Sequence, residues 1–283
     1  MGKVIKGGFL GVPQDDRAYP VTPDSFLFHI PHASTHFPFR EGFYRPELVA
    51  GEVEKLTDWY TDRIFHVDGV DSVKAEFSRV FCDVERFVPD AVEPMAAKGM
   101  GFYYTKTDNG QHFRHEGEWK EIVLRDFYSP HHARLTELVR HKLEATGLCC
   151  LIDGHSFAEV PFLREVDQHS ERPDICLGTQ GLHTPAWLVD AVRSIYQAAG
   201  LSVELNRPYA GSMVPLEFLD KEPRVFSIMI EVNRRLYLRD GGAIPGSLER
   251  LQGLTKAVTE KILEAWKREE SDRDAQLILA GPD

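Results

Sequence analysis

Three short apolar runs, each followed closely by polar side chains, constrain the fold of this chain more than any other feature. The runs cover residues 25–28, 148–152 and 226–230, and His32, His155 and Glu231 come shortly after them. A continuous apolar run is typical of a strand that is buried on both faces of a largely parallel sheet. Because open α/β sheets bind ligands at the carboxyl ends of their strands, we expect these polar side chains to meet at one edge of a sheet.

Helical segments alternate with the expected strands. A helix bent near Gly51 is expected at 46–65, and two helices at 118–128 and 130–145 are expected to be separated at Ser129-Pro130. Further helices are expected at 185–199 and 247–267, and further strands at 72–77, 79–83, 174–178 and 201–205. The alternation predicts one α/β domain over residues 1–283, with a central mixed, mainly parallel sheet flanked by helices. Within it, residues 1–24 are expected to form a lead-in and residues 268–283 a frayed tail.

The composition disfavours several kinds of partner. A net charge of −11, from 33 basic and 44 acidic residues, argues against nucleic acid or an anionic membrane as the main partner. A small anionic substrate in a locally basic pocket is compatible with it. No run approaches the roughly 18 apolar residues of a membrane span, and the N-terminus lacks the apolar core of a signal peptide. The four cysteines form no C-x-x-C pair, so we expect free thiols in a reducing compartment and a cytoplasmic protein.

The polar residues after the apolar runs have the chemistry of a metal site. Two histidines and one carboxylate from separate segments are a ligand set of catalytic Zn²⁺, which leaves one position open. His32 and His155 supply the imidazoles, and Asp58 is the candidate carboxylate, with Asp62 one helical turn further on as its rival. The structural alternative for both aspartates is a solvated helix face.

Two further features bear on catalysis. Glu231 is the candidate general base, because a carboxylate beside a metal, without coordinating it, can take a proton from water. Residues 85–117 lack a clean period but are rich in glycine, proline and aromatic residues, so we expect a functional cover over the site. Ser156 is not expected to be a nucleophile, because no G-x-S-x-G turn surrounds it.

Five segments occur in the order seen in one known family. They are P-H-A-S at 31–34, L-T-D-W-Y-T-D at 56–62, D-G-H-S-F at 153–157, P-D-I-C-L-G at 173–178 and I-E-V-N-R-R-L-Y at 230–237. With these segments the chain resembles the N-formylglutamate amidohydrolase family from about residue 25 to 265. The resemblance implies a fold similar to that of zinc carboxypeptidases, with one metal at the strand ends. It also implies hydrolysis of N-formyl-L-glutamate to formate and glutamate, a step in histidine breakdown.

Residue by residue, the resemblance implies His32, Asp58 and His155 as ligands of Zn²⁺ or another divalent metal, and Glu231 as the catalytic carboxylate. The implied substrate carries two carboxylates, for which arginine is the expected partner. The implied substrate-binding residues are Arg86, Arg234, His132, Tyr209 and Gly211. This chain has Glu85 where family members often show Asn in an Asp-x-Asn-Arg pattern, and this departure weakens the expectation of glutamate specificity more than that of the metal.

Alternatives to these roles and to this function stay open. Arg86 has a structural alternative as an ion pair with Asp83 or Glu85, and His132 as a packing residue at a helix start. The nearest alternative function is that of a zinc carboxypeptidase-like hydrolase acting on another N-acyl amino acid or a small peptide. A more distant one is a catalytically silent relative that binds a ligand in the same cleft.

Overall fold

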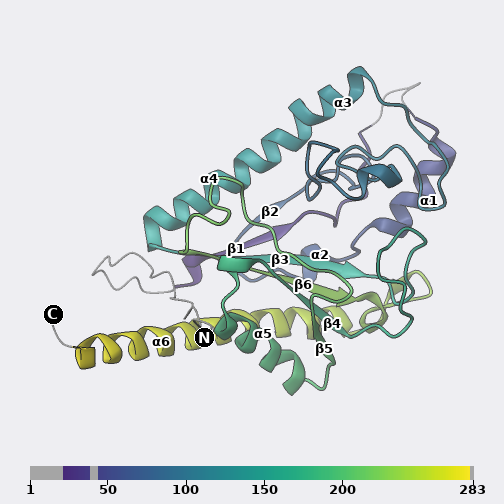
Figure 1. Cartoon of the computed structure of the whole chain (residues 1–283). Helices are drawn as coiled ribbons and strands as arrows, with labels where there is room; N and C mark the ends of the chain where they lie inside the picture. Colours follow the sequence, from purple (N-terminus) through teal and green to yellow (C-terminus); the bar gives the residue numbers. More distant parts are fainter. Residues whose placement is uncertain (1–21, 39–43, 281–283) are drawn as a thin grey trace, which may run out of the picture.

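A six-stranded mixed sheet forms the centre of the molecule (Figure 1). The computed structural model describes residues 22–38 and 44–280 of the chain. The strands are β1 (Phe26–Ile30), β2 (Asp71–Lys74), β3 (Cys149–Phe157), β4 (Ile175–Thr179), β5 (Val203–Leu205) and β6 (Val225–Asn233). Their order is β2-β1-β3-β6-β4-β5, in which the first four run parallel and β4 runs antiparallel to β6. The predicted α/β class with a mixed, mainly parallel sheet is confirmed.

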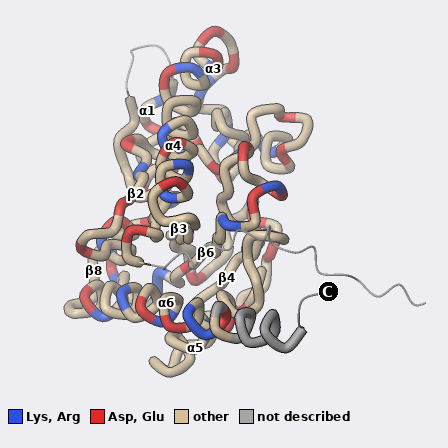
Figure 2. The backbone as a smooth tube through the Cα atoms, turned by 90° about the vertical axis from the view of Figure 1, so that its left-hand side faces the viewer, with Lys and Arg blue, Asp and Glu red and all other residues tan. Residues whose placement is uncertain are grey.

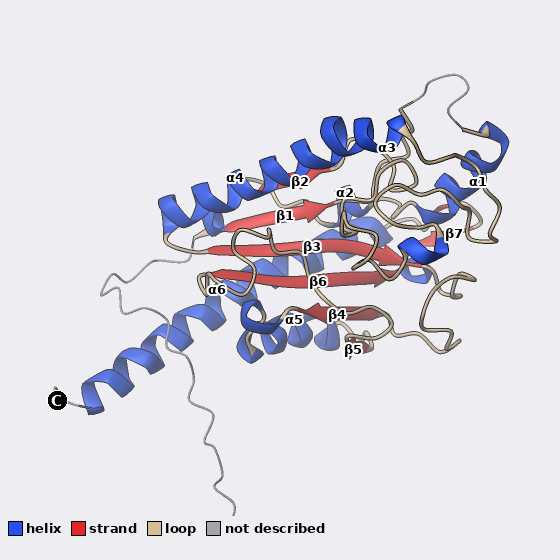
Figure 3. Cartoon of the chain, turned by 45° about the horizontal axis from the view of Figure 1, so that its top comes forward, coloured by secondary structure: helices blue, strands red, loops and turns tan. Residues whose placement is uncertain are grey.

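Helices cover both faces of this sheet. They are α1 (Pro46–Leu56), α2 (Thr61–Ile64), α3 (Glu118–Val123), α4 (Ser129–Thr146), α5 (Ala186–Ala198) and α6 (Ser247–Ala280). The strands β7 (Leu238–Arg239) and β8 (Gly242–Ala243) form a separate two-stranded sheet. The helix α4 lies on one face of the large sheet and α5 with α6 on the other (Figures 1 and 3). The face under α4 is the one that carries the polar side chains described below.

Side-chain alternation along β3 explains how one strand serves both the core and the polar edge. Leu151 packs with Leu135 of α4, while Ile152 belongs to the core under α5 and α6. Since successive side chains of a strand point to opposite faces, Asp153 and His155 lie on the α4 face with Leu151. Gly154 points the other way, where a Cβ would overlap the ring of Phe65.

Two strands extend beyond the apolar runs that predicted them. The run at 148–152 lies at the start of a strand that continues through Phe157, and the run at 226–230 lies in one that continues through Asn233. Asp153, His155 and Glu231 therefore lie within strands and not in loops after them. Figure 3 shows β1, β3 and β6 pointing toward the end of the molecule at which α1 and the long loops lie.

Two predicted elements are wrong. Residues 79–83 form turns and not a strand, because Ser78 satisfies the segment locally: its side chain accepts from Val80 N–H and its carbonyl from Phe81 N–H. Ser129-Pro130 does not separate two helices. A π-helical turn over Leu124–Tyr128 joins α3 to α4 without a break, directly before the proline that lacks an N–H.

The predicted bend of the first helix and the predicted ends of the chain also differ from the structure. The helix α1 passes Gly51 and ends at Leu56, and the break falls at residues 57–60, where Tyr60 has a left-handed φ of 62°. The helix α6 continues to Ala280 and includes most of the segment predicted to fray. Most of the predicted lead-in, residues 1–21, lies outside the described residues.

Basic and acidic residues are interspersed along the described chain. Lys or Arg and Asp or Glu alternate along α6 and α4, as Figure 2 shows. Among the described residues, no helix is long and apolar enough to cross a membrane. The excess of acidic residues over the whole chain is not gathered into one segment of this view.

Candidate metal centre and active site

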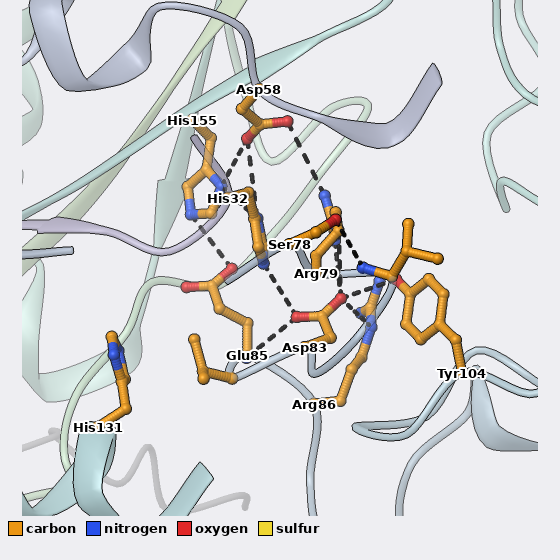
Figure 4. Close-up of polar contacts among 12 residues, drawn as sticks. His32, Asp58, Ser78, Arg79, Asp83, Glu85, Arg86, Tyr104, His131 and His155 are labelled. Carbon is orange, nitrogen blue, oxygen red and sulfur yellow. Dashed lines mark hydrogen bonds and ion pairs between the residues drawn. The ribbon is translucent and has the colours of Figure 1, made fainter. Parts of the chain in front are cut away.

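Three predicted ligand side chains meet at the carboxyl end of the parallel strands (Figure 4). The Nδ1 atoms of His32, just after β1, and His155, in β3, lie 3.2 Å apart. Asp58 Oδ2 lies 3.3 Å from His155 Nδ1 and 3.7 Å from His32 Nδ1. Tetrahedral Zn²⁺ with bonds of about 2.0–2.1 Å places its ligand atoms roughly 3.3 Å from one another. The three donor atoms therefore fit a divalent cation.

The other ring nitrogens fix which tautomer each histidine adopts. His32 Nε2 lies 2.9 Å from Asp83 Oδ1, and His155 Nε2 lies 3.1 Å from Asp153 Oδ1. A carboxylate can only accept, so each Nε2 carries a proton and each Nδ1 is the nitrogen that faces the centre. Burial would lower the pKa of His155, but Glu85, Asp153 and Asp58 raise it well above its usual value. A cation bound by Nδ1 would displace any proton there. A carboxylate behind each histidine is the usual support of a metal-bound imidazole.

The support behind His155 continues to α4. His29 Nδ1 donates to Asp153 over 2.8 Å, which leaves its Nε2 to accept from His131 Nε2 at 2.9 Å. Burial, together with the neighbouring histidines, lowers the pKa of His131 to about 2, so this ring is neutral. The result is a buried chain of defined donors and acceptors from α4 to the centre.

Asp58 owes its position to the break between α1 and α2. Its backbone N–H donates to the carbonyl of His32 over 3.0 Å, and its carboxylate accepts from Ser156 N–H and Arg234 Nη2. Burial would raise the pKa of Asp58, but His155, His32 and Arg234 hold it well below its usual range. Asp62, the rival ligand, is exposed on α2. The structure therefore brings Asp58, and not Asp62, to the two histidines.

Asp83 is the other buried anchor. Besides His32, it accepts hydrogen bonds from Tyr104 Oη at 2.7 Å and from Arg79 Nη2 at 3.0 Å (Figure 4). Burial would raise the pKa of Asp83, but Arg79, His32 and Arg86 hold it well below its usual range. Arg86 Nε lies 3.5 Å from this carboxylate, so the predicted ion pair with Asp83 is present.

Glu231 lies directly across from His155 in the register of β6 and β3. Paired residues of parallel strands point to the same face, so the carboxylate lies beside the histidine ring. Its Oε2 is buried and has no hydrogen-bond partner among the described residues. Burial, with Asp58 and Glu85 adding to it, raises the pKa of Glu231 to about 8, although His155 and Arg79 oppose the shift. A carboxyl group of this kind can gain and lose a proton near neutral pH.

A cavity of about 610 Å³ opens onto this cluster. Eight of the nine residues predicted for the site line it: His32, His155, Glu231, Arg86, Arg234, His132, Tyr209 and Gly211. The ninth, Asp58, lies behind the two histidines. Nine residues of the predicted cover at 85–117 also line the cavity, from Glu85 and Arg86 to Tyr104 and Asp108. The segment lies beside α1 at the carboxyl end of the sheet (Figure 1).

The predicted substrate-binding residues differ in how many hydrogen bonds and ion pairs they already make within the protein. Arg234 is engaged by Asp58, by the backbone carbonyls of Lys55 and Ser156, and by the Ser156 hydroxyl. Arg86 Nε is buried and faces Asp83 in the ion pair at 3.5 Å, without a hydrogen bond among the described residues. His132 is bonded through Nε2 to the carbonyl of Val84 at 2.7 Å, so it packs as well as lining the cavity.

Tyr209 and Gly211 belong to the loop that borders the cavity beyond β5. The Tyr209 carbonyl accepts from Cys176 Sγ in β4, and the ring packs against Phe157 of β3. Gly211 has φ 94°, a conformation that side chains disfavour, and its carbonyl lies against Gly178 where a Cβ would clash. The loop therefore packs tightly onto the sheet beside the cluster.

Glu85 occupies the position at which the family pattern predicts asparagine. Its Oε2 lies 3.1 Å from His155 Nε2 and its Oε1 lies 3.6 Å from His29 Nδ1. Two groups, His32–Glu85–His155 and His29–Glu85–Asp153, are close enough to hold a metal ion. A carboxylate here adds negative charge to the cavity wall beside the centre.

Sequence reasoning missed Asp83, Asp153, His29, His131 and Arg79. Asp153 had a usable signal, because it lies two residues before His155 on a strand and so points to the same face. His29 is paired with Asp153 across β1 and β3, which requires the strand order to be known. Asp83 and Arg79 lie in the segment predicted as a strand, and the turn that brings them to His32 had no comparable signal.

A mixed α/β sheet that brings two imidazoles and buried carboxylates to one cavity is the arrangement of an α/β enzyme with its site at the strand ends. The model of the N-formylglutamate amidohydrolase family matches residues 24–238, and the chain belongs to this family. It is an amidohydrolase by this membership.

Solved structures agree with the fold. The crystal structure of N-formylglutamate amidohydrolase from Ralstonia eutropha JMP134 is 24% identical, with a TM-score of 0.73 over 87% of this chain and 95% of that one. A gene product of Agrobacterium tumefaciens is 20% identical, with a TM-score of 0.53 over 84% of this chain and 90% of that one. A search of the curated proteins found no match.

Proposed function

We propose that this chain is a divalent-metal-dependent hydrolase of a small N-acyl amino acid, with N-formyl-L-glutamate as substrate and formate and L-glutamate as products. The observation that supports metal dependence is the spacing of His32 Nδ1, His155 Nδ1 and Asp58 Oδ2, at 3.2 to 3.7 Å from one another. Family membership supports the substrate. Zn²⁺ suits this ligand set, and other divalent ions also fit it.

A divalent cation held by these residues would supply Lewis-acid polarisation of the amide carbonyl and activation of water. Glu231 then takes one proton from the attacking water, as the oxygen–carbon bond forms. It passes that proton to the amide nitrogen as the carbon–nitrogen bond breaks, which leaves formate and the free amine. The unpartnered Oε2 of Glu231 is the atom available for this transfer.

The substrate carboxylates require cationic partners. Arg86 borders the cavity, and its ion pair with Asp83 through Nε holds it beside the metal ligands, so we assign it to the α-carboxylate. Arg234 lines the same cavity but mainly holds Asp58 in place, since its nitrogens are already bonded. Tyr209, Gly211 and His132 shape the wall.

The test combines metal analysis with a deformylation assay. Purified protein is expected to carry about one divalent ion per chain, and Glu231→Gln to lose at least 100-fold in kcat with the ion retained. Glu264→Gln, on the exposed side of α6, is the matched control and is expected to behave as wild type. Full turnover after chelation would refute metal dependence, and normal turnover of Glu231→Gln would refute the base.

Two observations favour a second candidate, hydrolysis of another N-acyl amino acid. The cavity of about 610 Å³ is large for a substrate as small as N-formylglutamate. Glu85 also places a negative charge beside the centre, where a dicarboxylate gains nothing. A panel of N-acyl amino acids separates the candidates, because a preference for the dicarboxylate supports the first and a preference for a neutral side chain supports the second.

A further inference from the structure

Arg164 lines the same cavity from the loop that follows β3, and sequence reasoning did not single it out. Its Nη1 is buried and has no hydrogen-bond partner among the described residues. A buried guanidinium nitrogen without an acceptor is costly, so its presence at a cavity wall points to a ligand that supplies one.

The backbone around Arg164 is fixed before any ligand binds. The Asp108 carboxylate accepts from Arg164 N–H at 2.9 Å and from Leu163 N–H at 3.1 Å, and it pairs with Lys55. The Arg164 carbonyl accepts from Lys98 Nζ at 2.6 Å. Three hydrogen bonds, two to Asp108 and one to Lys98, therefore hold this short stretch, and Lys55 in turn holds Asp108.

The side chain itself is held at one nitrogen only. Arg164 Nε donates to the carbonyl of Asp108 at 2.9 Å, which orients the plane of the guanidinium. Three carboxylates lie near this segment: Asp108 is engaged as described, and Glu52 accepts from the N–H of Asp108. Glu165, which also lines the cavity, pairs through Oε2 with Arg172, while its Oε1 has no hydrogen-bond partner among the described residues. The remaining edge of the guanidinium is preorganised for an outside carboxylate, which binds arginine in a planar, forked geometry.

We propose that Arg164 forms a carboxylate subsite that holds the side-chain carboxylate of the substrate. This inference rests on the proposed function for the identity of that substrate. Arg86 contacts Asp83, which contacts His32, so it lies near the metal ligands and suits the α-carboxylate next to the scissile nitrogen. Arg164 is anchored instead to Asp108, which contacts none of the metal ligands, and so suits the side-chain carboxylate, whose carbon is two bonds further from the scissile nitrogen.

Binding of glutarate, a dicarboxylate without a scissile amide, tests the subsite apart from turnover. Calorimetry on the metal-loaded protein compares wild type, Arg164→Met and Lys98→Met, the last of which removes a contact to the same residue but keeps the guanidinium. Arg164→Met is expected to bind glutarate about 30-fold more weakly, as for a lost charge-assisted hydrogen bond, and Lys98→Met like wild type. Equal binding by Arg164→Met and wild type, or an equal loss in Lys98→Met, overturns the proposal.

Turnover identifies which carboxylate is bound. Arg164→Met is expected to raise KM for N-formyl-L-glutamate by about 30-fold and to leave N-formyl-L-glutamine, its neutral isostere, within about threefold. Equal losses for both substrates overturn the assignment. Arg164→Lys, which keeps the charge but not the fork, is expected to be intermediate and serves if the methionine variant does not fold. If wild type binds glutarate through Arg164 but does not hydrolyse N-formylglutamate, the proposed function fails and the subsite stands.

Discussion

At the scale of single residues, the centre depends on carboxylates that do not reach it. Asp83 and Asp153 each accept a hydrogen bond from Nε2 of one histidine and so turn both Nδ1 atoms inward. His29 and His131 extend this order to α4. The side chains that would bind a cation are thus oriented by a buried network that exists without one.

Asp153→Asn removes the charge that holds His155 and His29. We expect zinc affinity to fall by about 10- to 100-fold, as for other losses of a carboxylate behind a metal-bound histidine. Competition with a chromophoric chelator measures this directly. Asp190→Asn, on the exposed side of α5, is the control. An unchanged affinity in Asp153→Asn would show that the network does not orient the ligand.

Glu231 makes the reaction depend on pH in a defined direction. Burial raises its pKa to about 8, so the carboxyl is protonated at low pH and cannot accept a proton there. We therefore expect kcat/KM to increase with pH up to about 8, with a midpoint that shifts lower when a cation is bound close by. A pH profile of wild type against Glu231→Gln checks this, and a flat wild-type profile from pH 5 to 9 would contradict it.

At the scale of elements, the sequence predicted where the main strands begin better than where they end. Apolar residues mark the buried start of β3, but Asp153 and His155 continue the strand as polar residues because they bond to one another and to β1. No local sequence pattern predicts hydrogen-bond partners that come from another strand. The turn at 79–83 could not be predicted for the same reason, because Asp83 accepts hydrogen bonds from the Arg79 side chain and from the N–H of Glu85.

Which site residues could be predicted from the sequence also depends on whether their contacts are local or come from distant segments. His32, His155 and Glu231 could be chosen because each lies close after an apolar run, and His155 and Glu231 are paired on one face of β3 and β6. Asp58 was preferred to Asp62 for its place after the first strand and then by family resemblance, and its predicted helix face is in fact a break stabilised by contacts with His32 and Arg234. Arg164 depends on contacts with Asp108, 56 residues away in the sequence.

A substitution at Gly154 tests the close packing of β3 against Phe65, which follows α2. A methyl group at this position would overlap the ring of Phe65, so Gly154→Ala is expected to lower the free energy of unfolding by about 1–3 kcal/mol. Gly253→Ala in α6, where nothing lies within 4 Å, is expected to raise it by about 0.5–1 kcal/mol. Denaturant unfolding of both variants decides the matter. A destabilised Gly253→Ala, or an unaffected Gly154→Ala, would contradict this packing.

At the scale of the whole molecule, the centre joins segments that are far apart in the sequence. His32 follows β1, Asp58 separates α1 from α2, and His155 lies in β3, so a shared cation would tie all three together. The cover at 85–117 reaches the same place through Glu85, which contacts His155, and through Arg86, which pairs with Asp83 just before it. Stability and catalysis would then share one set of contacts.

Removal of the metal should therefore lower the stability of the protein. An ion present at 100 times its dissociation constant adds about 2.7 kcal/mol to the free energy of unfolding. We expect the thermal midpoint to rise with added Zn²⁺ in wild type and to respond less in Asp58→Asn, which keeps the size of the side chain but loses a ligand charge. Equal midpoints with and without the ion in wild type would refute the site.

The pairing of His155 with Glu231 across β3 and β6 has a consequence for how this protein can diverge. Deleting or inserting one residue in either strand would turn every later side chain of that strand to the opposite face, and one partner would then point into the core under α5 and α6. Relatives that keep the chemistry are thus expected to align without gaps through 153–157 and 229–233, and to vary in length only where the chain leaves the sheet.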